Sequence, residues 1–265
     1  MRNRKRTVDL AVEGVVIVVS ILLAFALDAW WESRGQRQEE AQVLENLSSE
    51  FQAAGIQLDR YLMMHQVILS SLEKTLAAVQ EAHDRGDSRV EILTIDLSRI
   101  LIGPTFDPRT GILDGLLASG GLGILQSESL RRTLSGWPGL LAEASEEESR
   151  SVHLILEHID PALRDGTDLS RARFLSIEIT EEACNNMLWG RSCGDIDLEV
   201  ALPAKWNGTM SLPADLGTLG LLSTRLHILK HGIDQLETVR EEIEVILALV
   251  EESRGSTPRT GDRLP

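Results

Sequence analysis

The chain contains few cysteines and few aromatic residues. Its two cysteines, Cys184 and Cys193, have no histidine or further cysteine near them at the spacing of metal ligands. Aromatic residues make up 4% of the 265 residues, whereas leucine, glutamate, alanine and arginine are abundant. A cysteine-based metal domain is therefore not expected, and the composition favours helices over a β-sandwich.

Positive charge is scarce beyond the N-terminus. The chain has 26 lysines and arginines against 41 aspartates and glutamates, which gives a net charge of −15. Residues 1–34 hold five basic and four acidic residues, so residues 35–265 carry −16. Because an acidic surface repels phosphate backbones, nucleic acid is not expected as a partner. The negative charge either keeps a long helical surface soluble or attracts a basic protein partner.

The sequence contains no recognisable catalytic or cofactor-binding motif. His227 and His231 share one helix face and could bind a metal, but no third ligand is identifiable. Ser119-Gly120-Gly121 lacks the lysine of a P-loop and is predicted to form a tight turn. The acidic runs Glu146-Glu147-Glu148 and Glu241-Glu242 are predicted to be solvated helix faces. We therefore expect a protein that is not an enzyme and that uses no cofactor or metal.

One long apolar run lies near the N-terminus. Residues 10–27 contain a single ionisable side chain, Glu13. As a helix they would span about 27 Å, close to the ~30 Å hydrocarbon core of a bilayer. We predict one transmembrane helix over residues 9–31. Its predicted anchors at the two membrane interfaces are Arg4, Lys5, Arg6, Trp30 and Trp31.

A cleaved signal peptide is the alternative explanation of this run. Ala24-Phe25-Ala26 fits the small-x-small pattern of a cleavage site. However, Glu13 interrupts the apolar run, and the run is long for a signal peptide. We therefore expect the segment to be retained as an anchor.

The charges around the anchor predict its orientation. Basic residues favour the cytoplasmic side, so residues 1–8 would form a cytoplasmic tail and the chain would then cross the membrane. In a bacterium this places the anchor in the inner (cytoplasmic) membrane and residues 32–253 in the periplasm, followed by a disordered tail at residues 254–265. In such an oxidising compartment Cys184 and Cys193 would form a local disulfide, with two free buried thiols as the alternative.

Small and polar residues recur along one side of the predicted anchor. Steps of three and four residues place on one stripe Asp9, Glu13, Ile17, Ser20, Ala24 and Asp28. Ser20 and Ala24 form a small-xxx-small pair that lets another backbone approach. The stripe predicts a partner helix, from a second copy of the chain or from another membrane subunit. The alternative is that Asp9 and Glu13 only extend toward the basic N-terminus.

Two long amphipathic helices are predicted, at residues 38–83 and 214–253. Each carries a coiled-coil-like apolar seam. The first seam consists of Leu44, Leu47, Phe51, Ala54, Leu58, Leu62, His65, Leu69, Leu72, Leu76 and Val79, and the second of Leu219, Leu222, Leu226, Leu229, Ile233, Leu236, Val239, Ile243, Ile246 and Val250. Two seams of matching length pack most economically on each other within one chain, and self-association of each helix is the alternative. The predicted fold is therefore mostly α.

Shorter elements are predicted between the two long helices. Helices are expected at residues 90–101, 111–118, 128–135 and 138–159, with Ser127 as the N-cap of the third. The stretches 174–180 and 196–202 alternate apolar and polar residues. We predict that they pair as a small β-hairpin, closed by the cysteine pair.

Two stretches resemble a known family. They are AVEGVVIVVSILLAFALDAWWESR at residues 11–34 and FDPRTGILDGLLASGGLGILQSESLRRTL at residues 106–134. Both resemble a family of uncharacterised bacterial single-pass membrane proteins, whose acid-glycine pair is matched by Glu13-Gly14 and whose polar-aromatic exit is matched by Asp28-Ala29-Trp30-Trp31. The resemblance implies an N-terminal anchor and a helical extracytoplasmic domain, but no activity. The cysteine-containing region 166–212 departs from the family's pattern.

These features predict an accessory role. We expect a non-catalytic scaffold or accessory subunit whose anchor docks in a larger membrane complex and whose helical domain lies in the periplasm. Its expected partners are the lipid bilayer, other membrane subunits or a second copy, and a basic periplasmic protein. A respiratory or photosynthetic energy-transducing complex is one candidate host. A sensor or signalling protein is the alternative, although a cytoplasmic part of about eight residues leaves no room for an output domain.

Overall fold

The computed structural model describes residues 2–164, 167, 169–173, 175 and 208–256, and residues 2–17 by their backbone only. The predicted mostly α fold is confirmed, with two long helices, shorter helices between them in sequence, and one two-stranded sheet. The chain divides into two compact units. The first comprises Met1–Phe51, Thr110–Ser135 and Ile246–Pro265, and the second Gln52–Arg109 and Gly136–Val245.

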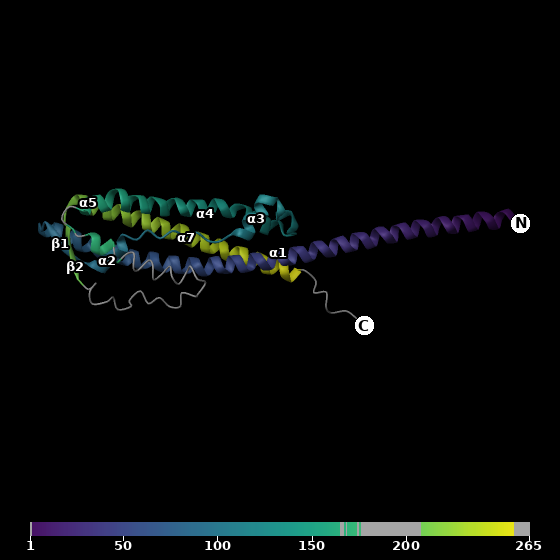
Figure 1. Cartoon of the computed structure of the whole chain (residues 1–265), viewed down its shortest axis with the longest axis horizontal. Coiled ribbons are helices and arrows are strands. Elements are labelled where there is room, and N and C mark those ends of the chain that lie inside the picture. The colour runs from purple at the N-terminus through teal and green to yellow at the C-terminus, as the bar shows by residue number, and fades with distance from the viewer. Residues whose placement is uncertain (1, 165–166, 168, 174, 176–207, 257–265) are drawn as a thin grey trace. The chain divides into compact units, whose positions relative to one another are not determined.

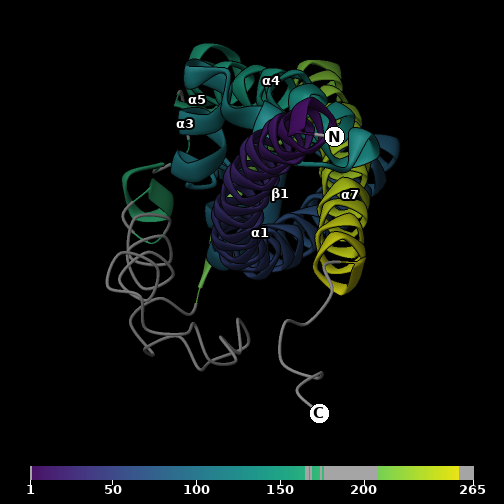
Figure 2. The same cartoon turned by 90° about the vertical axis from the view of Figure 1, so that its right-hand side faces the viewer.

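Helix α1 spans Arg2–Arg85 without a break. The predicted anchor and the predicted amphipathic helix therefore form one element (Figures 1 and 2). Its end is set by Gly86, which adopts a left-handed φ of 80°. That conformation lets the N–H groups of Gly86 and Asp87 donate to the carbonyls of His83 and Ala82, both at 2.9 Å. A glycine is needed here because other residues rarely adopt this backbone conformation.

Helix α7 spans Leu216–Ser256 and pairs with α1 in antiparallel orientation. In the second unit the Lys230 ammonium lies 2.8 Å from a Glu73 carboxylate oxygen, and His83 hydrogen-bonds the carbonyl of Ala214 at 3.0 Å. In the first unit Arg254 pairs with Glu45. The predicted pairing of the two long helices within one chain is therefore correct.

The predicted seams are buried with three exceptions. In α1, Ile68 and Thr75 are buried where Leu69 and Leu76 were predicted, and those two leucines are only partly buried. In α7, Arg225 is fully buried, whereas the neighbouring Leu226 is partly exposed. With these replacements the buried positions recur at three- and four-residue steps, as in a heptad repeat.

Strand β1, Arg89–Leu93, stands where the sequence predicted the start of a helix. It pairs antiparallel with β2, Thr209–Pro213, so that Ile92 faces Met210. Helix α2, Thr94–Ile100, follows directly. The prediction of a helix from residue 90 is wrong because pairing with a strand more than a hundred residues away is invisible to a local pattern.

The predicted hairpin of residues 174–180 and 196–202 lies outside the described residues, apart from Leu175. The same holds for the last nine residues of the predicted tail.

The sheet, α2 and the residues after α4 share a core in the second unit. Its members are Ile92, Leu97, Leu101, Leu154, Ile155, Ile159, Leu163, Ala172, Met210 and Leu212. Because successive side chains of a strand point to opposite faces, one face of the sheet formed by β1 and β2 packs into this core.

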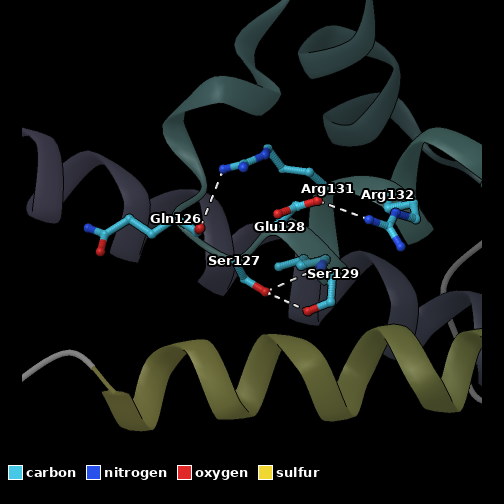
Figure 3. Close-up of polar contacts among 7 residues, drawn as sticks. Gln126, Ser127, Glu128, Ser129, Arg131 and Arg132 are labelled. Carbon is cyan, nitrogen blue, oxygen red and sulfur yellow. Dashed lines mark hydrogen bonds and ion pairs between the residues drawn. The ribbon is translucent and has the colours of Figure 1, made fainter.

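Helix α3, Gly111–Ser119, is confirmed, and so is the turn after it, where Gly120 adopts a φ of 70°. A short 3₁₀ turn, η1, spans Gly121–Ile124. Helix α4, Glu128–Leu154, begins as predicted, since the Leu130 N–H donates to the hydroxyl of Ser127 at 3.2 Å (Figure 3). Two arginines brace the same turn (Figure 3): Arg132 pairs with Glu128 at 2.9 Å, and Arg131 donates to the carbonyl of Gln126.

The predicted break in α4 before Pro138 does not exist. The helix continues through this proline, which removes one intrahelical hydrogen bond without ending the element. A π-helical turn, η2, follows at Ile155–Ile159, and then α5 at Asp160–Arg164. Pro161 lies in the first turn of α5, directly after the π-helical turn, and has no N–H to donate to the preceding turn.

Candidate functional site

An exposed apolar segment occupies residues 18–31 of α1. Its large apolar side chains are between 48% and 68% exposed, and they are Val18, Val19, Ile21, Leu22, Leu23, Phe25, Leu27, Trp30 and Trp31. At about 100° of rotation per residue they lie on most of the circumference of the helix, and Ser20, Ala24 and Asp28 occupy the remaining side. The other exposed large apolar residues of the described chain are scattered singly or few to an element. An exposed apolar surface of this extent is typical of a helix that contacts another apolar phase or partner.

The predicted stripe is only partly described. Ser20, Ala24 and Asp28 are exposed on α1. The side chains of Asp9, Glu13 and Ile17, and those of the predicted anchors Arg4, Lys5 and Arg6, lie outside the described residues, as do Cys184 and Cys193. The stripe as a partner surface and the disulfide therefore stay predictions.

Within the portion of the chain that the structure describes, no helix is both long enough and apolar enough to cross a membrane.

The C-terminal end of the apolar segment carries an aromatic and basic cluster. The rings of Trp30 and Trp31 meet edge to face, with centroids 5.8 Å apart, and the Arg34 guanidinium lies 5.6 Å from the Trp30 ring. One turn later Arg37 donates from Nε to the carbonyl of Ser33 at 3.1 Å and from Nη2 to its hydroxyl at 2.8 Å. Sequence reasoning singled out the tryptophans but missed both arginines, although the four-residue step from Trp30 to Arg34 was visible.

A fully buried arginine lies in the second unit. Arg225 of α7 donates from Nη2 to the carbonyl of Ile102 at 2.9 Å and from Nη1 to the hydroxyl of Ser151. Its Nε has no hydrogen-bond partner, and no carboxylate of the described residues forms an ion pair with it. Burial lowers the pKa of Arg225 to about 10.

A buried histidine on α1 is affected by the same charge. His65 hydrogen-bonds the carbonyl of Tyr61 at 2.8 Å. Burial lowers the pKa of His65, the bond to Tyr61 opposes this, and the charge of Arg225 adds to the lowering. His65 is therefore held in its neutral form near neutral pH.

The prediction that Glu146-Glu147-Glu148 is a solvated face is wrong for two of the three residues. Glu146 is exposed, but Glu147 and Glu148 are buried. Glu148 lies one turn after Ala144 on the buried side of α4, and both of its oxygens accept the Phe106 N–H, at 3.0 and 2.9 Å. Burial raises the pKa of Glu148 to about 7, and the hydrogen bond from Phe106 opposes this.

Two further glutamates, both on α1, hold backbone N–H groups in the first unit. Glu50 accepts from Ile112 at 2.7 Å and from Leu113 at 3.1 Å, at the N-terminus of α3. Glu40, which is buried, accepts from Gln126 at 2.7 Å. These carboxylates stabilise the connection between α2 and α4.

A close packing contact fixes the start of that connection in the second unit. A Cβ added to Gly103 would lie 2.6 Å from Cγ2 of Val152 on α4, so the backbone approaches the helix at a distance that only glycine allows. The adjacent carbonyl of Ile102 is the one that Arg225 binds. Nearby, the ring of Phe106 packs edge to face on Tyr61 of α1 at 5.8 Å.

The histidine pair on α7 is exposed. His231 lies 3.7 Å from a carboxylate oxygen of Glu147, and His227 lies one turn earlier. Among the residues that the structure describes, no group of three or more histidine, cysteine, aspartate or glutamate side chains is placed to hold a metal ion.

Comparison with known families gives one match. A model described as a family of unknown function (DUF6090) matches residues 13–137. This range includes most of the predicted anchor, Glu40 and Glu50, but it ends before Glu148 and Arg225. Neither the curated proteins nor the solved structures gave a match. The chain is thus similar over these residues to a family of unknown function, which agrees with the sequence resemblance in that the family is uncharacterised.

Proposed function

We propose that the protein is a non-catalytic, single-pass membrane protein that serves as an accessory or scaffold subunit. The observation that carries this proposal is the apolar segment at residues 18–31, whose large apolar side chains are between 48% and 68% exposed. In water that surface would be unfavourable, since each exposed square ångström of apolar area costs about 25 cal/mol. A bilayer removes this cost, and the apolar run at residues 10–17 lengthens the segment to a span.

The charge distribution supports an orientation for the proposed anchor. Four basic residues precede the apolar run, whereas residues 35–265 carry −16. We place the N-terminus in the cytoplasm and the helical domain in the periplasm of a bacterial inner membrane. The stripe that includes Ala24 and Asp28 is the surface proposed to meet a partner helix, from another subunit or a second copy. A basic periplasmic protein would suit the acidic domain.

Membrane fractionation of the full chain tests the anchor. The wild-type protein is expected to stay in the membrane pellet after carbonate extraction. The double variant Leu22→Lys/Leu23→Lys should move to the supernatant, because each lysine at a helix centre costs about 3 kcal/mol of insertion free energy. Leu156→Lys and Leu216→Lys alter exposed leucines elsewhere and serve as controls that stay in the pellet. Release of the wild-type protein by carbonate would refute the anchor.

Purification in a mild detergent tests the accessory role. We expect other membrane proteins to co-migrate with the wild-type chain. Fewer should co-migrate with Ala24→Leu, because the bulkier side chain prevents the close approach of a partner helix to the stripe. Leu23→Ala is the matched control on another side of the same helix. A wild-type protein that migrates alone as a monomer would contradict the accessory role and leave the anchor intact.

A further inference from the structure

We propose that one face of α1, made of Trp30, Arg34 and Arg37, binds the phosphate of an anionic lipid headgroup where the helix leaves the membrane. We call this the arginine face. The proposal rests on the proposed function, because it requires the apolar segment to lie in a bilayer. It adds a specific lipid partner to that function.

The arginine face lies at the depth of lipid headgroups. The apolar segment ends at Trp31. At 1.5 Å per residue, Arg34 lies about 4.5 Å and Arg37 about 9 Å further along the axis. Headgroups occupy roughly the first 5–8 Å outside the hydrocarbon core. Both arginines therefore start at or just beyond the headgroup layer.

Both arginine side chains reach back toward the apolar segment. The guanidinium of Arg34 lies over the ring of Trp30, and that of Arg37 lies against Ser33. Each spans one helical turn in the N-terminal direction, which brings the two charges to the level of residues 30–33. The aromatic ring and the serine fix the two guanidinium groups in place, so less side-chain entropy is lost when a ligand binds.

The exposed carboxylates of this part of α1 lie on the opposite side, whereas Glu40, about 60° from Arg37, is buried and accepts the N–H of Gln126. In a helical projection Arg34 and Arg37 are within about 40° of Trp30, whereas Asp28, Glu32 and Glu39 are about 160–180° away. No ion pair joins either arginine to a described carboxylate. A phosphate can therefore approach the arginine face without meeting an exposed carboxylate of this segment, because Glu40 is buried.

The chemistry of this face fits a phosphate better than it fits a carboxylate-rich protein. Arginine forks bind phosphate oxygens in pairs, and the neighbouring tryptophans suit the boundary between acyl chains and headgroups. The position at the end of a span points to a phospholipid and not to a free anion. Two positive charges without counter-ions favour a headgroup with net negative charge, such as phosphatidylglycerol, over zwitterionic phosphatidylcholine.

Lipid retention by the full-length protein tests the proposal. The protein is reconstituted in bilayers of equal parts phosphatidylglycerol and phosphatidylcholine, and the lipids that stay bound are counted by native mass spectrometry. We expect the wild-type protein to retain phosphatidylglycerol with a preference of roughly 25-fold, since each of the two arginines near the membrane surface contributes about fivefold. Arg34→Gln/Arg37→Gln should reduce the preference to near one while the protein remains in the bilayer.

Two controls make the outcome specific. Arg164→Gln/Arg240→Gln removes two exposed arginines elsewhere and should keep the full preference. Arg34→Lys/Arg37→Lys keeps the charge but loses the fork and should give an intermediate preference. An unchanged preference in Arg34→Gln/Arg37→Gln, or an equal loss in the Arg164 and Arg240 control, would overturn the arginine face. Failure of the wild-type chain to enter the bilayer at all would instead refute the proposed anchor.

Discussion

Burial of Glu148 makes the free energy of unfolding depend on pH. Its pKa is raised from 4.5 to about 7 in the folded chain, so the unfolded state loses its proton first as pH rises. The contribution of Glu148 to the free energy of unfolding is therefore largest below about pH 4.5. It falls as the pH rises toward 7 and changes no further above about pH 7. The loss is bounded at about 3 kcal/mol.

We predict that Glu148→Gln removes this pH dependence. The variant keeps an oxygen for the Phe106 N–H but cannot ionise, so its free energy of unfolding relative to wild type should increase between pH 5 and pH 8 by up to about 3 kcal/mol. Urea unfolding at several pH values measures this difference. Glu146→Gln, at an exposed neighbour, should show no such trend, and a flat difference for Glu148→Gln would contradict the assignment.

Gly103 gives a second prediction at this scale. Gly103→Ala places a methyl group 2.6 Å from Val152, and we expect a loss of about 1–3 kcal/mol in the free energy of unfolding. The double variant Gly103→Ala/Val152→Ala should recover part of it. Gly139→Ala in α4, where a Cβ meets nothing within 4 Å, should instead stabilise by about 0.5–1 kcal/mol. Equal effects at Gly103 and Gly139 would mean that the contact with Val152 is unimportant.

Residue roles were predicted unevenly from the sequence. The N-cap at Ser127 and the turn at Gly120 were correct because both depend on local backbone chemistry. Arg225 and Glu148 were missed because a charged residue is assumed to face water unless a partner is known, and their partners are backbone groups of Ile102 and Phe106. A local sequence pattern does not show which distant backbone group a charged side chain will hydrogen-bond.

At the scale of elements, α3 depends on a cap from outside its own segment. Its N-cap residue, Thr110, makes no side-chain cap bond, and Glu50 of α1 accepts the N–H groups of Ile112 and Leu113 instead. A carboxylate at this end also interacts favourably with the helix dipole. The short helix is thus stabilised by a residue about sixty positions earlier in the chain.

We predict that Glu50→Ala weakens α3 more than it weakens the rest of the first unit. The expected loss is about 1–2 kcal/mol, and amide hydrogen exchange at Ile112 and Leu113 should become faster. Glu45→Ala removes a more exposed carboxylate, the partner of Arg254, and should cost less than about 1 kcal/mol. Unchanged exchange at both amides would show that the cap does not hold the helix.

Elements with a strong local pattern were predicted well, and those that depend on remote partners were not. Helix α3 and the ends of α1 and α7 agree with prediction within three residues, apart from the junction with the anchor. Strand β1 was mistaken for helix because its partner, β2, begins far along the chain. The break predicted at Pro138 failed for a related reason, since packing of buried residues such as Trp137 and Ala144 holds α4 together across the proline.

At the scale of the whole molecule, the antiparallel pair of α1 and α7 brings an N-terminal and a C-terminal helix into contact. We predict that a zero-length carbodiimide couples Lys230 to Glu73, whose charged atoms are 2.8 Å apart. In a mixture of unlabelled and ¹⁵N-labelled protein, the cross-linked peptides should contain two unlabelled or two labelled halves. Peptides that mix the labels would show that the helices pair between copies.

Lys230→Arg provides the control for this cross-link. Arginine keeps the ion pair but does not react with a carbodiimide-activated carboxylate, so the cross-linked peptide should disappear while the fold is unchanged. The pairing itself was predictable because two long seams have few other ways to bury their apolar faces. The cellular setting stays a proposal, since the first half of the predicted span has no described side chains.

The pairing of β1 with β2 has a consequence for how the chain tolerates changes in length. Leu93 lies opposite Thr209, so the chain between them is a closed loop. The entropy lost in closing a loop grows only with the logarithm of its length, at about 0.6 kcal/mol per doubling. As far as loop closure is concerned, a modest change in the length of this loop hardly alters stability. One residue added within β2 would instead turn Met210 and Leu212 from the core toward solvent.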